Sequence, residues 1–255
     1  MCFNNSQSKK AEQIARKYGR KTDVIEAWRE IVEERRRNGE KIYDLTDGAY
    51  NIPAMLSPYS AIVTADPELR PMRWGLIPYN TKDWTEVERK GKGGWFKNAK
   101  AEKVFDTWPY KLVIEHKRCV IPSTGYFEPH YNPDGSKVPY YARVQGDEVF
   151  SIGGLWSSWT NPDTGESVES YTMITIGANE LMSEVHNGGN NPYRMPFIVA
   201  EGDVQRWLDP DLPAPEIERL FRKFPAERME AYEVPKAMWS PRNMMNKRIT
   251  ERVIP

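Results

Sequence analysis

The chain has 255 residues, and its 36 lysines and arginines are balanced by 36 aspartates and glutamates. A net charge of zero excludes a general attraction to nucleic acid, so any such contact must come from a local patch. No apolar run approaches the ~18 residues that cross a bilayer, and the polar start NNSQSKK lacks the apolar core of a secretory signal. We therefore expect a soluble, cytoplasmic protein without membrane contact.

Two amphipathic helices are predicted near the start of the chain. The first has apolar residues at helical spacing over residues 11–18. The second opens at Asp23, has Glu26 three residues on, and stops at Gly39. Together they form an N-terminal helical insertion around residues 8–39.

From about residue 60 the chain changes to short β-rich runs bounded by Pro and Gly. These runs lie at 60–66, 72–78, 118–129, 138–144, 148–159, 169–177 and 194–200. Helical segments are expected between them, near 103–116, 178–186, 202–208 and 214–224. The pattern predicts an α+β fold with a barrel-like, mostly antiparallel β core and peripheral helices, in a single domain over residues 1–255.

The few cysteines and histidines limit the chemistry. Cys2 and Cys119 cannot build a disulfide framework, and we expect two reduced thiols, with Cys119 a small core residue. Three scattered histidines show no metal-ligand spacing, so no metal site is expected. Removal of Met1 would give Cys2 a free α-amine beside its thiol, and this 1,2-aminothiol can do chemistry that no internal residue can do.

Four stretches combine reactive and polar residues beside predicted strands. They are MC at the start, WFKNAKAEKV (95–104), PSTGYFEPHY (122–131) and MSEVHNGGNNPYRMPF (182–197). Each residue also has an ordinary interpretation. Taken alone, Asn98 suits a helix cap, Glu128 a solvated strand end, His186 a charge at a helix C-terminus, and Cys2 a disordered terminus.

Taken together, the blocks resemble the SRAP family, the SOS-response-associated peptidase domain. That family has MCGR, YNIAP, WGLIP, NARAET, GFYEW and H.RMP blocks. Their counterparts here are Met1–Cys2, YNIPA (50–54), WGLIP (74–78), NAKAEK (98–103), GYFEP (125–129) and the segment from His186 to Pro196. Order and most of the spacing are kept across nearly the whole chain.

The resemblance implies that the protein shields abasic sites in single-stranded DNA. The amine of Cys2 would form an imine with the ring-opened sugar aldehyde, and its thiol would close a five-membered thiazolidine. An α-amine pKa near ~8 and a thiol pKa near ~8.5 would leave useful fractions of both nucleophiles. No metal or organic cofactor is required, and we expect a monomer that associates with the nucleoid when bound to DNA.

The resemblance also implies a role for each matching residue. Asn98 would hydrogen-bond at the reacting sugar, Glu128 would shuttle protons during imine formation, and His186 would handle protons on the sugar oxygen. Phosphate and base contacts are expected from the basic and aromatic stretch 82–103, including Lys97 and Lys100, with Arg194 and with Trp74 as core or groove wall.

The chain departs from the family pattern at several positions. Phe3–Asn4 replaces the usual Gly-Arg, Lys100 replaces the arginine of NAR, and GYFEP lacks the final tryptophan. An extra segment, NGGNNPY (187–193), separates His186 from Arg194 and is predicted to loop outward. These changes affect DNA affinity and geometry more than the crosslinking residues, which all remain.

Two other functions stay open. The first is an N-terminal-nucleophile hydrolase or cysteine peptidase, in which Cys2 attacks a peptide carbonyl, with self-removal of Met1 as its simplest form. Lyase activity through an imine belongs with this enzymatic alternative. The second is a non-catalytic single-strand binding module, for which stretch 82–103 would matter and Cys2 would not.

Overall fold

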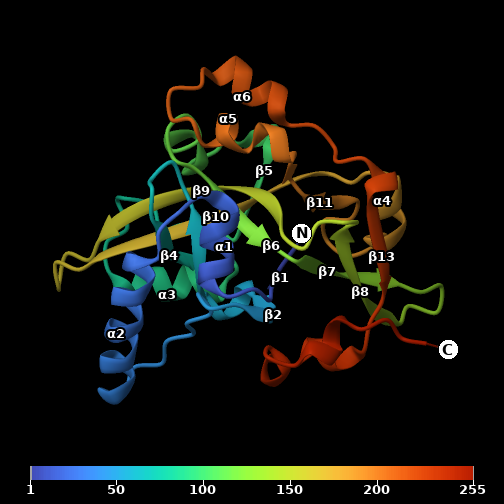
Figure 1. Cartoon of the computed structure of the whole chain (residues 1–255), viewed down its shortest axis with the longest axis horizontal. Coiled ribbons are helices and arrows are strands. Elements are labelled where there is room, and N and C mark those ends of the chain that lie inside the picture. Colours follow the sequence, from blue (N-terminus) through green and yellow to red (C-terminus); the bar gives the residue numbers. More distant parts are fainter. Residues whose placement is uncertain (1, 255) are drawn as a thin grey trace.

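The computed structural model describes residues 2–254, and five strands close into a ring at its centre (Figure 1). They are β3 (Tyr59–Val63), β4 (Leu69–Trp74), β6 (Arg118–Ser123), β9 (Phe150–Thr160) and β10 (Ser167–Gly177). The ring runs β4-β3-β6-β9-β10 and closes through a parallel pairing of β10 with β4, whereas its other pairings are antiparallel. The predicted α+β fold with a barrel-like, mostly antiparallel core is confirmed.

Strand β9 approaches its neighbours closely because two glycines stand in its middle. A Cβ at Gly154 would lie 2.7 Å from the backbone oxygen of Thr172 on β10. One at Gly153 would lie 2.5 Å from the ring of Phe197. A larger side chain at Gly154 would push β9 and β10 apart, and one at Gly153 would displace Phe197.

A second, antiparallel sheet carries the start of the chain. Its order is β13 (Met229–Glu233), β8 (Lys137–Val144), β7 (Gly125–Tyr131), β1 (Asn4–Gln7) and β2 (Ala49–Pro53). Strand β1 was not expected, because NNSQ reads as a polar terminus. It is stabilised by partners distant in sequence: the Asn5 side chain donates to the Pro122 carbonyl, and the Ser6 and Thr124 hydroxyls lie 3.0 Å apart.

Short strands extend the barrel at one end of β10. Strand β5 (Asn98–Lys100) runs parallel to β10, and β11 (Arg194–Pro196) runs antiparallel to it. Strand β12 (Ile198–Val199) pairs with β9. The last residues of β10 therefore bring two blocks of the sequence together, NAKAEK and the segment that ends in RMP.

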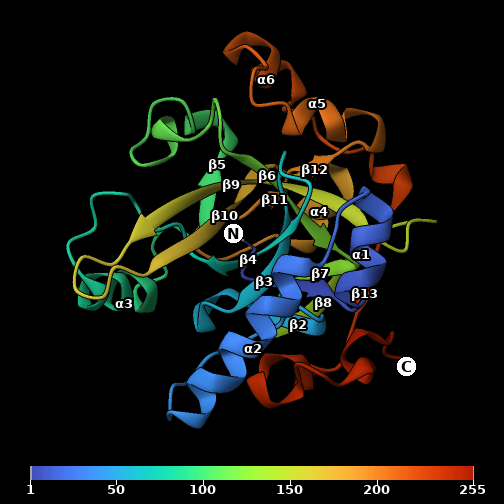
Figure 2. The same ribbon diagram turned by 60° about the vertical axis from the view of Figure 1, so that its left-hand side comes forward.

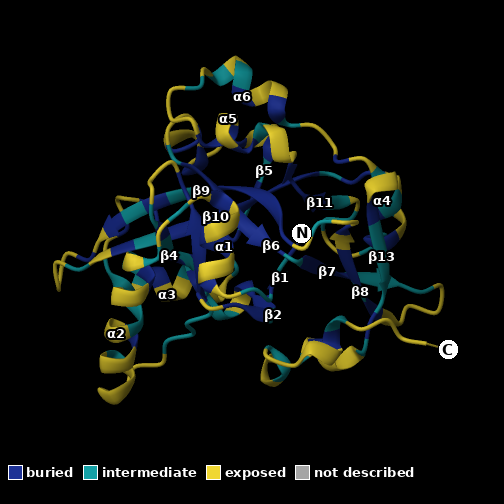
Figure 3. Cartoon of the chain, viewed as in Figure 1, coloured by how far each residue is buried: buried dark blue, intermediate teal, exposed yellow. Residues whose placement is uncertain are grey.

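The helices lie around the strands, with their exposed faces outward (Figure 3). Both N-terminal helices are confirmed, as α1 (Ala11–Tyr18) and α2 (Asp23–Arg37). The later ones are α4 (Glu180–Val185), α5 (Val204–Leu208) and α6 (Ala214–Leu220), each shorter than predicted. No helix within residues 2–254 is both long and apolar enough to cross a membrane.

The helices differ from the prediction in two places. The basic stretch 82–103 contains a helix that was not predicted, α3 (Trp84–Lys92), which begins after Asp83 because that side chain accepts the Glu86 amide. The helix packs beside the far end of the β9–β10 hairpin (Figure 2), where Trp84 stacks on Trp159. Residues 103–116, predicted to be helical, form only turns and the short 3-10 segments Ala101–Lys103 and Tyr110–Leu112.

Candidate functional site

Cys2 lies two residues before β1 and is buried, with 1 % of its surface exposed. The chain around it is fixed, because the Phe3 carbonyl accepts the Ala54 amide at 2.8 Å and Asn4 pairs with both neighbouring strands. Its thiol donates to the Asn4 carbonyl at 3.7 Å. Cys2 is therefore part of the core of the molecule, and the alternative of a disordered terminal residue is wrong. Cys119 is likewise a buried, free thiol, as predicted.

Glu128 comes to Cys2 from β7, the strand beside β1. Its carboxylate is buried, and burial raises its pKa to about 7, although hydrogen bonding with the Cys2 thiol opposes part of the shift. One carboxylate oxygen, Oε1, has no hydrogen-bond partner among residues 2–254. A buried, unpaired oxygen is costly unless a ligand uses it, so Glu128 is not a solvated strand end.

The pKa of the Cys2 thiol is also shifted by its surroundings. Burial, followed by the charge of Glu128, raises its pKa well above the ordinary value. The sequence-based expectation of a useful thiolate fraction concerns the chain without Met1 and stays a prediction. The thiol must lose its proton to a neighbouring base as it reacts, and Glu128 is such a base.

His186 follows α4 and completes this cluster. Its Nδ1 lies 3.0 Å from the Arg194 carbonyl and 3.8 Å from Glu128 Oε2. Burial lowers its pKa, and the hydrogen bond to Arg194 opposes the shift. Because the hydrogen-bond network assigns the proton to Nδ1, the neutral ring keeps a lone pair on Nε2. His186 is thus a buried neutral imidazole and not a charge on a helix end.

Asn98 is the first residue of β5, opposite Met173 of β10. Its backbone carbonyl accepts the Tyr110 hydroxyl at 3.0 Å. Its side-chain Oδ1 and Nδ2 are both buried without any hydrogen-bond partner in the described chain. An amide with both ends free is a donor and an acceptor ready for a ligand. No hydrogen bond within residues 2–254 joins it to Cys2, Glu128 or His186.

Two residues predicted to touch DNA belong to the interior. Trp74 is fully buried and donates its indole N–H to the Lys97 carbonyl at 2.9 Å, as the core interpretation expected. Lys97 is also 0 % exposed, and its ammonium donates to the Ser57 hydroxyl and, at 2.6 Å, to the Trp74 carbonyl. The expectation of Lys97 as a surface cation is corrected, because its amine is enclosed by neutral oxygen acceptors.

The other two predicted contacts are engaged within the chain. Lys100 donates to Asn191 at 3.0 Å, and Arg194 makes two bonds, of 2.7 and 3.0 Å, to the Glu102 carboxylate. The extra segment 187–193 is therefore fastened to β5 through Asn191. It is also fastened to the end of β7, because the Asn187 amide bonds both the N–H and the carbonyl of Tyr131.

The chain as a whole is similar to known proteins. Residues 1–241 match the family model described as SOS response associated peptidase (SRAP). The chain belongs to the SRAP family. The Bacillus subtilis abasic site processing protein YoqW is 30% identical over 207 residues, which cover 78% of this chain and 86% of that protein. The Gallus gallus abasic site processing protein HMCES is 29% identical over 198 residues, 69% of this chain and 55% of that one.

Solved structures show the same SRAP fold. An X-ray structure of a Bacteroides thetaiotaomicron protein superposes with a TM-score of 0.85 at 32% identity, covering 99% of this chain and 100% of that one. A Bordetella bronchiseptica protein has a TM-score of 0.72 at 22% identity, covering 92% of this chain and 100% of that one. Among residues 2–254 of this SRAP chain, no group of three or more His, Cys, Asp or Glu side chains could hold a metal ion.

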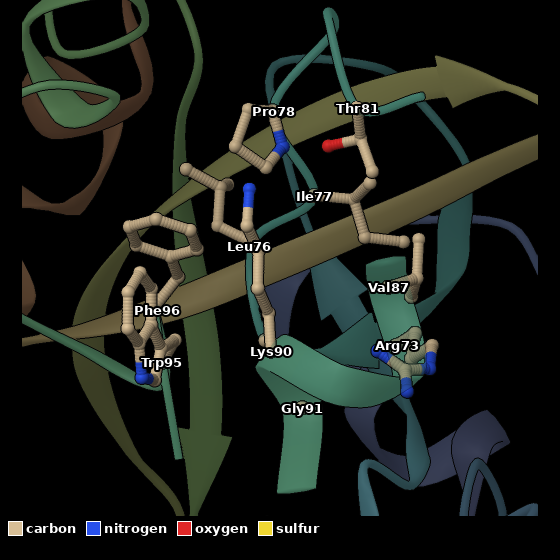
Figure 4. A pocket seen from close by; sticks show the side chains of 11 residues that line it. Arg73, Leu76, Ile77, Pro78, Thr81, Val87, Lys90, Gly91, Trp95 and Phe96 are labelled. Carbon is tan, nitrogen blue, oxygen red and sulfur yellow. The ribbon is translucent and has the colours of Figure 1, made fainter. Parts of the chain in front are cut away.

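An aromatic cluster of this SRAP chain was only partly anticipated. Trp95 and Trp108 are exposed on either side of Phe96, whose ring meets both edge-on at 6.0 and 5.6 Å. The Lys90 ammonium lies 5.6 Å from the Trp108 ring. Figure 4 shows Trp95 and Phe96 together on one side of Lys90, with Arg73 on the other. The density of tryptophan and lysine in 82–103 signalled part of this cluster, but nothing in the sequence joined Trp108 to it.

Proposed function

We propose that this SRAP protein captures abasic sites in single-stranded DNA by a covalent crosslink through Cys2, acting as a monomer. The observation that carries the proposal is the burial of Cys2 against Glu128, a carboxylate that has one unpaired oxygen and lies 3.8 Å from the buried imidazole of His186. The names of curated relatives support abasic sites as the target, since they match most of this chain.

The proposed chemistry requires Met1 to be removed, and Met1 lies outside the described residues. The freed amine of Cys2 adds to the sugar aldehyde, and loss of water gives an imine. The thiol then adds across the C=N bond, so that a C–S bond forms and the ring nitrogen gains a proton. The saturated ring no longer withdraws electrons, and strand scission by β-elimination is suppressed.

Glu128 supplies the proton transfers in this scheme. The Cys2 thiol is neutral before reaction, because burial and the nearby carboxylate raise its pKa. A carboxylate with a pKa of about 7 can accept that proton as sulfur attacks and return it to nitrogen. The transfer conserves protons overall and needs no external acid or base.

Asn98 and His186 act on the sugar. The unpaired amide of Asn98 is suited to hold an oxygen of the ring-opened sugar by donating through Nδ2, with Oδ1 left to accept a hydroxyl. His186 is suited to exchange a proton with the sugar oxygen through Nε2, because Nδ1 is committed to the Arg194 carbonyl.

A peptidase function is the second candidate, and the neutral thiol beside a carboxylate is the observation that favours it. The same proton transfer would let Cys2 attack the carbonyl of Met1, removing Met1 autocatalytically. Lyase activity would follow if the imine persisted before ring closure.

Denaturing electrophoresis of the purified protein with an oligonucleotide carrying one abasic site tests the proposal. We expect a slow-migrating band that survives boiling, and an intact mass that corresponds to the chain without Met1. A peptide substrate serves as the comparison. Turnover of the peptide without any stable product on the abasic strand would establish the peptidase and reject the shield.

A further inference from the structure

Outside this site, Arg73 on β4 is a largely enclosed cation without an anionic partner. Its guanidinium lies 5.6 Å from the Trp84 ring of α3. A Cβ added at Gly91 would meet both the guanidinium and the Ser57 hydroxyl at 3.4 Å, which places those two groups around the same point. Within residues 2–254, no carboxylate lies within 4 Å of this guanidinium, and Glu88 acts on it only from farther away.

A second basic side chain, that of the fully buried Lys97, lies next to Arg73. Lys97 donates to the same Ser57 hydroxyl, and its other partner is the Trp74 carbonyl, so both of its partners are neutral. Burial and then the charge of Arg73 lower the pKa of Lys97 to about 7. A positive charge on the buried Lys97 beside the partly buried Arg73 is unfavourable unless an anion joins them.

Arg73 faces a cavity of about 510 Å³ between α3, β4, the residues before β3 and the chain after α2, and Lys97 lies behind its wall. Arg73 and Ser57 line it, together with Lys41 and Lys92, while Glu88 and Glu40 provide negative charge. Neither Lys41 nor Lys92 is in an ion pair within the described chain, whereas the lining Arg35 is paired with Glu166. The uncompensated charge of the cavity is therefore positive, and its volume admits a phosphate with its attached sugar.

The backbone at Ser57 supports a functional interpretation. This serine has a φ of +47°, a left-handed conformation that costs energy for any residue with a Cβ. The conformation points its hydroxyl at the junction of the two cations. Strain of this kind is commonly retained where a side chain serves a ligand.

We infer that this cavity, the Arg73 cavity, is a second phosphate-binding site, which holds a phosphodiester group of the DNA strand away from the reacting sugar. The inference rests on the proposed function for its choice of the strand as the source of the phosphate. A direct path supports that choice, since Ala54, whose amide bonds the Phe3 carbonyl, is followed by Met55, Leu56 and Ser57 on the cavity wall. A strand leaving Cys2 along this segment reaches the cavity within a few residues.

Binding of undamaged single-stranded oligonucleotides over a series of salt concentrations tests the inference. We expect Arg73→Gln and Lys92→Gln each to weaken binding about tenfold and to reduce the log–log salt slope by about 0.7, the value for one phosphate contact on a single strand. Arg73→Lys should keep the slope. Arg89→Gln is the matched control, because Arg89 is exposed on the same helix but does not line the cavity.

Thermal unfolding with inorganic phosphate identifies the source of the anion. Phosphate should raise the midpoint of the wild-type chain and compete with the oligonucleotide, and neither effect should occur in Arg73→Gln. Unchanged salt slopes in both Arg73→Gln and Lys92→Gln would overturn the strand as the ligand, even if phosphate still stabilised the protein. No effect of phosphate and no change of slope would overturn the site altogether.

Failure of the inference is distinguishable from failure of the proposed function. The binding series uses DNA without any aldehyde, so it does not depend on Cys2 chemistry. If the wild-type chain forms no crosslink, but Lys92→Gln still reduces the log–log salt slope by about 0.7, the proposed function is rejected and the Arg73 cavity is kept. If the wild-type chain crosslinks normally and neither variant changes the slope, the proposed function is kept and the Arg73 cavity is rejected. Lys92 is exposed, so this variant remains informative if Arg73→Gln fails to fold.

Discussion

The nucleophile cluster of Cys2, Glu128 and His186 differs instructively from the basic stretch 82–103. The cluster unites Cys2 with two residues more than a hundred positions farther along the chain, yet all three are buried. The basic stretch is continuous in sequence, yet its residues have opposite environments, with Lys97 enclosed in the core and Trp95 54 % exposed. The family sequence blocks predicted the residues of the nucleophile cluster. The composition of 82–103 did not predict which of its side chains reach solvent.

The difference has a physical cause. The pairing of β1 with β7 brings Cys2, two residues before β1, close to Glu128 on β7. Lys97 is buried because Gly75, with a φ of +116°, leaves room for its stem: a Cβ there would lie 2.7 Å from the ammonium. The composition of 82–103 holds no information about that glycine.

The largest effect is expected at the nucleophile. Cys2→Ala should abolish the crosslink that survives boiling and leave noncovalent binding of undamaged single strands in place, because the aminothiol is lost but the basic and aromatic residues of 82–103 are not. A residue left in front of Cys2 should be equally damaging. Cys119→Ala removes the other buried thiol, from the barrel, and should crosslink normally. Normal crosslinking by a chain with a blocked amino terminus would exclude the ring mechanism.

Glu128→Gln should slow crosslink formation by roughly 10²–10⁴-fold, the usual range for a lost general acid–base. The wild-type rate should rise with pH through the Glu128 pKa of about 7, as the carboxylate becomes able to accept the thiol proton, and the variant should lack that step. Single-turnover rates from pH 5 to 9 measure both effects. Glu227→Gln, at an exposed carboxylate, provides the control.

Glu128→Gln should slow crosslinking but increase the stability of the folded protein at alkaline pH. Burial raises the pKa of Glu128 in the folded state, so its contribution to stability is fully present below the unfolded pKa near 4.5 and is lost as pH rises through about 7. At pH 8, Glu128→Gln should therefore unfold at a higher temperature than wild type. A lower midpoint at that pH would mean that the carboxylate is paired more favourably than this structure indicates.

His186→Ala should slow formation and reversal of the crosslink by the same factor, about a hundredfold, because one proton carrier serves both directions of a step. The yield at equilibrium should not change. Rates measured after mixing and after dilution with competing aldehyde give the two values. Slowing in one direction only would place His186 outside the reacting centre, as a residue that merely supports Arg194.

How much the sequence could predict follows from individual elements. The barrel strands, both N-terminal helices and the α+β class were predictable, because their apolar spacing is local. Strand β1 was not, because its polar side chains are satisfied by Pro122 and Thr124, far along the chain. The four site residues came from the family blocks alone. Their protonation states needed burial, which raises the Cys2 and Glu128 pKa values and lowers that of His186.

A smaller effect, on stability rather than chemistry, is expected at Lys97. Lys97→Ala removes a buried stem and leaves the Trp74 carbonyl and the Ser57 hydroxyl without their shared donor, which should cost about 1–3 kcal/mol of unfolding free energy. Urea denaturation measures the change. Lys100→Ala, at a partly exposed lysine in the same stretch, should cost less. If Lys97→Ala were as stable as wild type and had a reduced salt slope for DNA binding, Lys97 would be a surface residue that contacts DNA.

The smallest effect is expected in the segment 187–193. Asn191→Ala removes the single bond that holds Lys100 at 3.0 Å and leaves the two bonds of Asn187 to Tyr131 intact, so the loop stays attached and His186 does not move. Crosslinking to plain single strands should change less than about twofold, because this one partly buried hydrogen bond contributes about 1 kcal/mol and does not touch the reacting groups.

Deleting the whole segment 187–193 in favour of a two-residue link should likewise preserve crosslinking to plain strands but alter preference among strand junctions, since the segment sits between β5 and the end of β7. A set of oligonucleotides with the abasic site in a single strand or at either kind of junction measures that preference. If Asn191→Ala already abolished crosslinking, Lys100 and Asn191 would belong to the reacting site itself. Catalytic competence would then depend on the stretch 82–103 as much as on the nucleophile cluster.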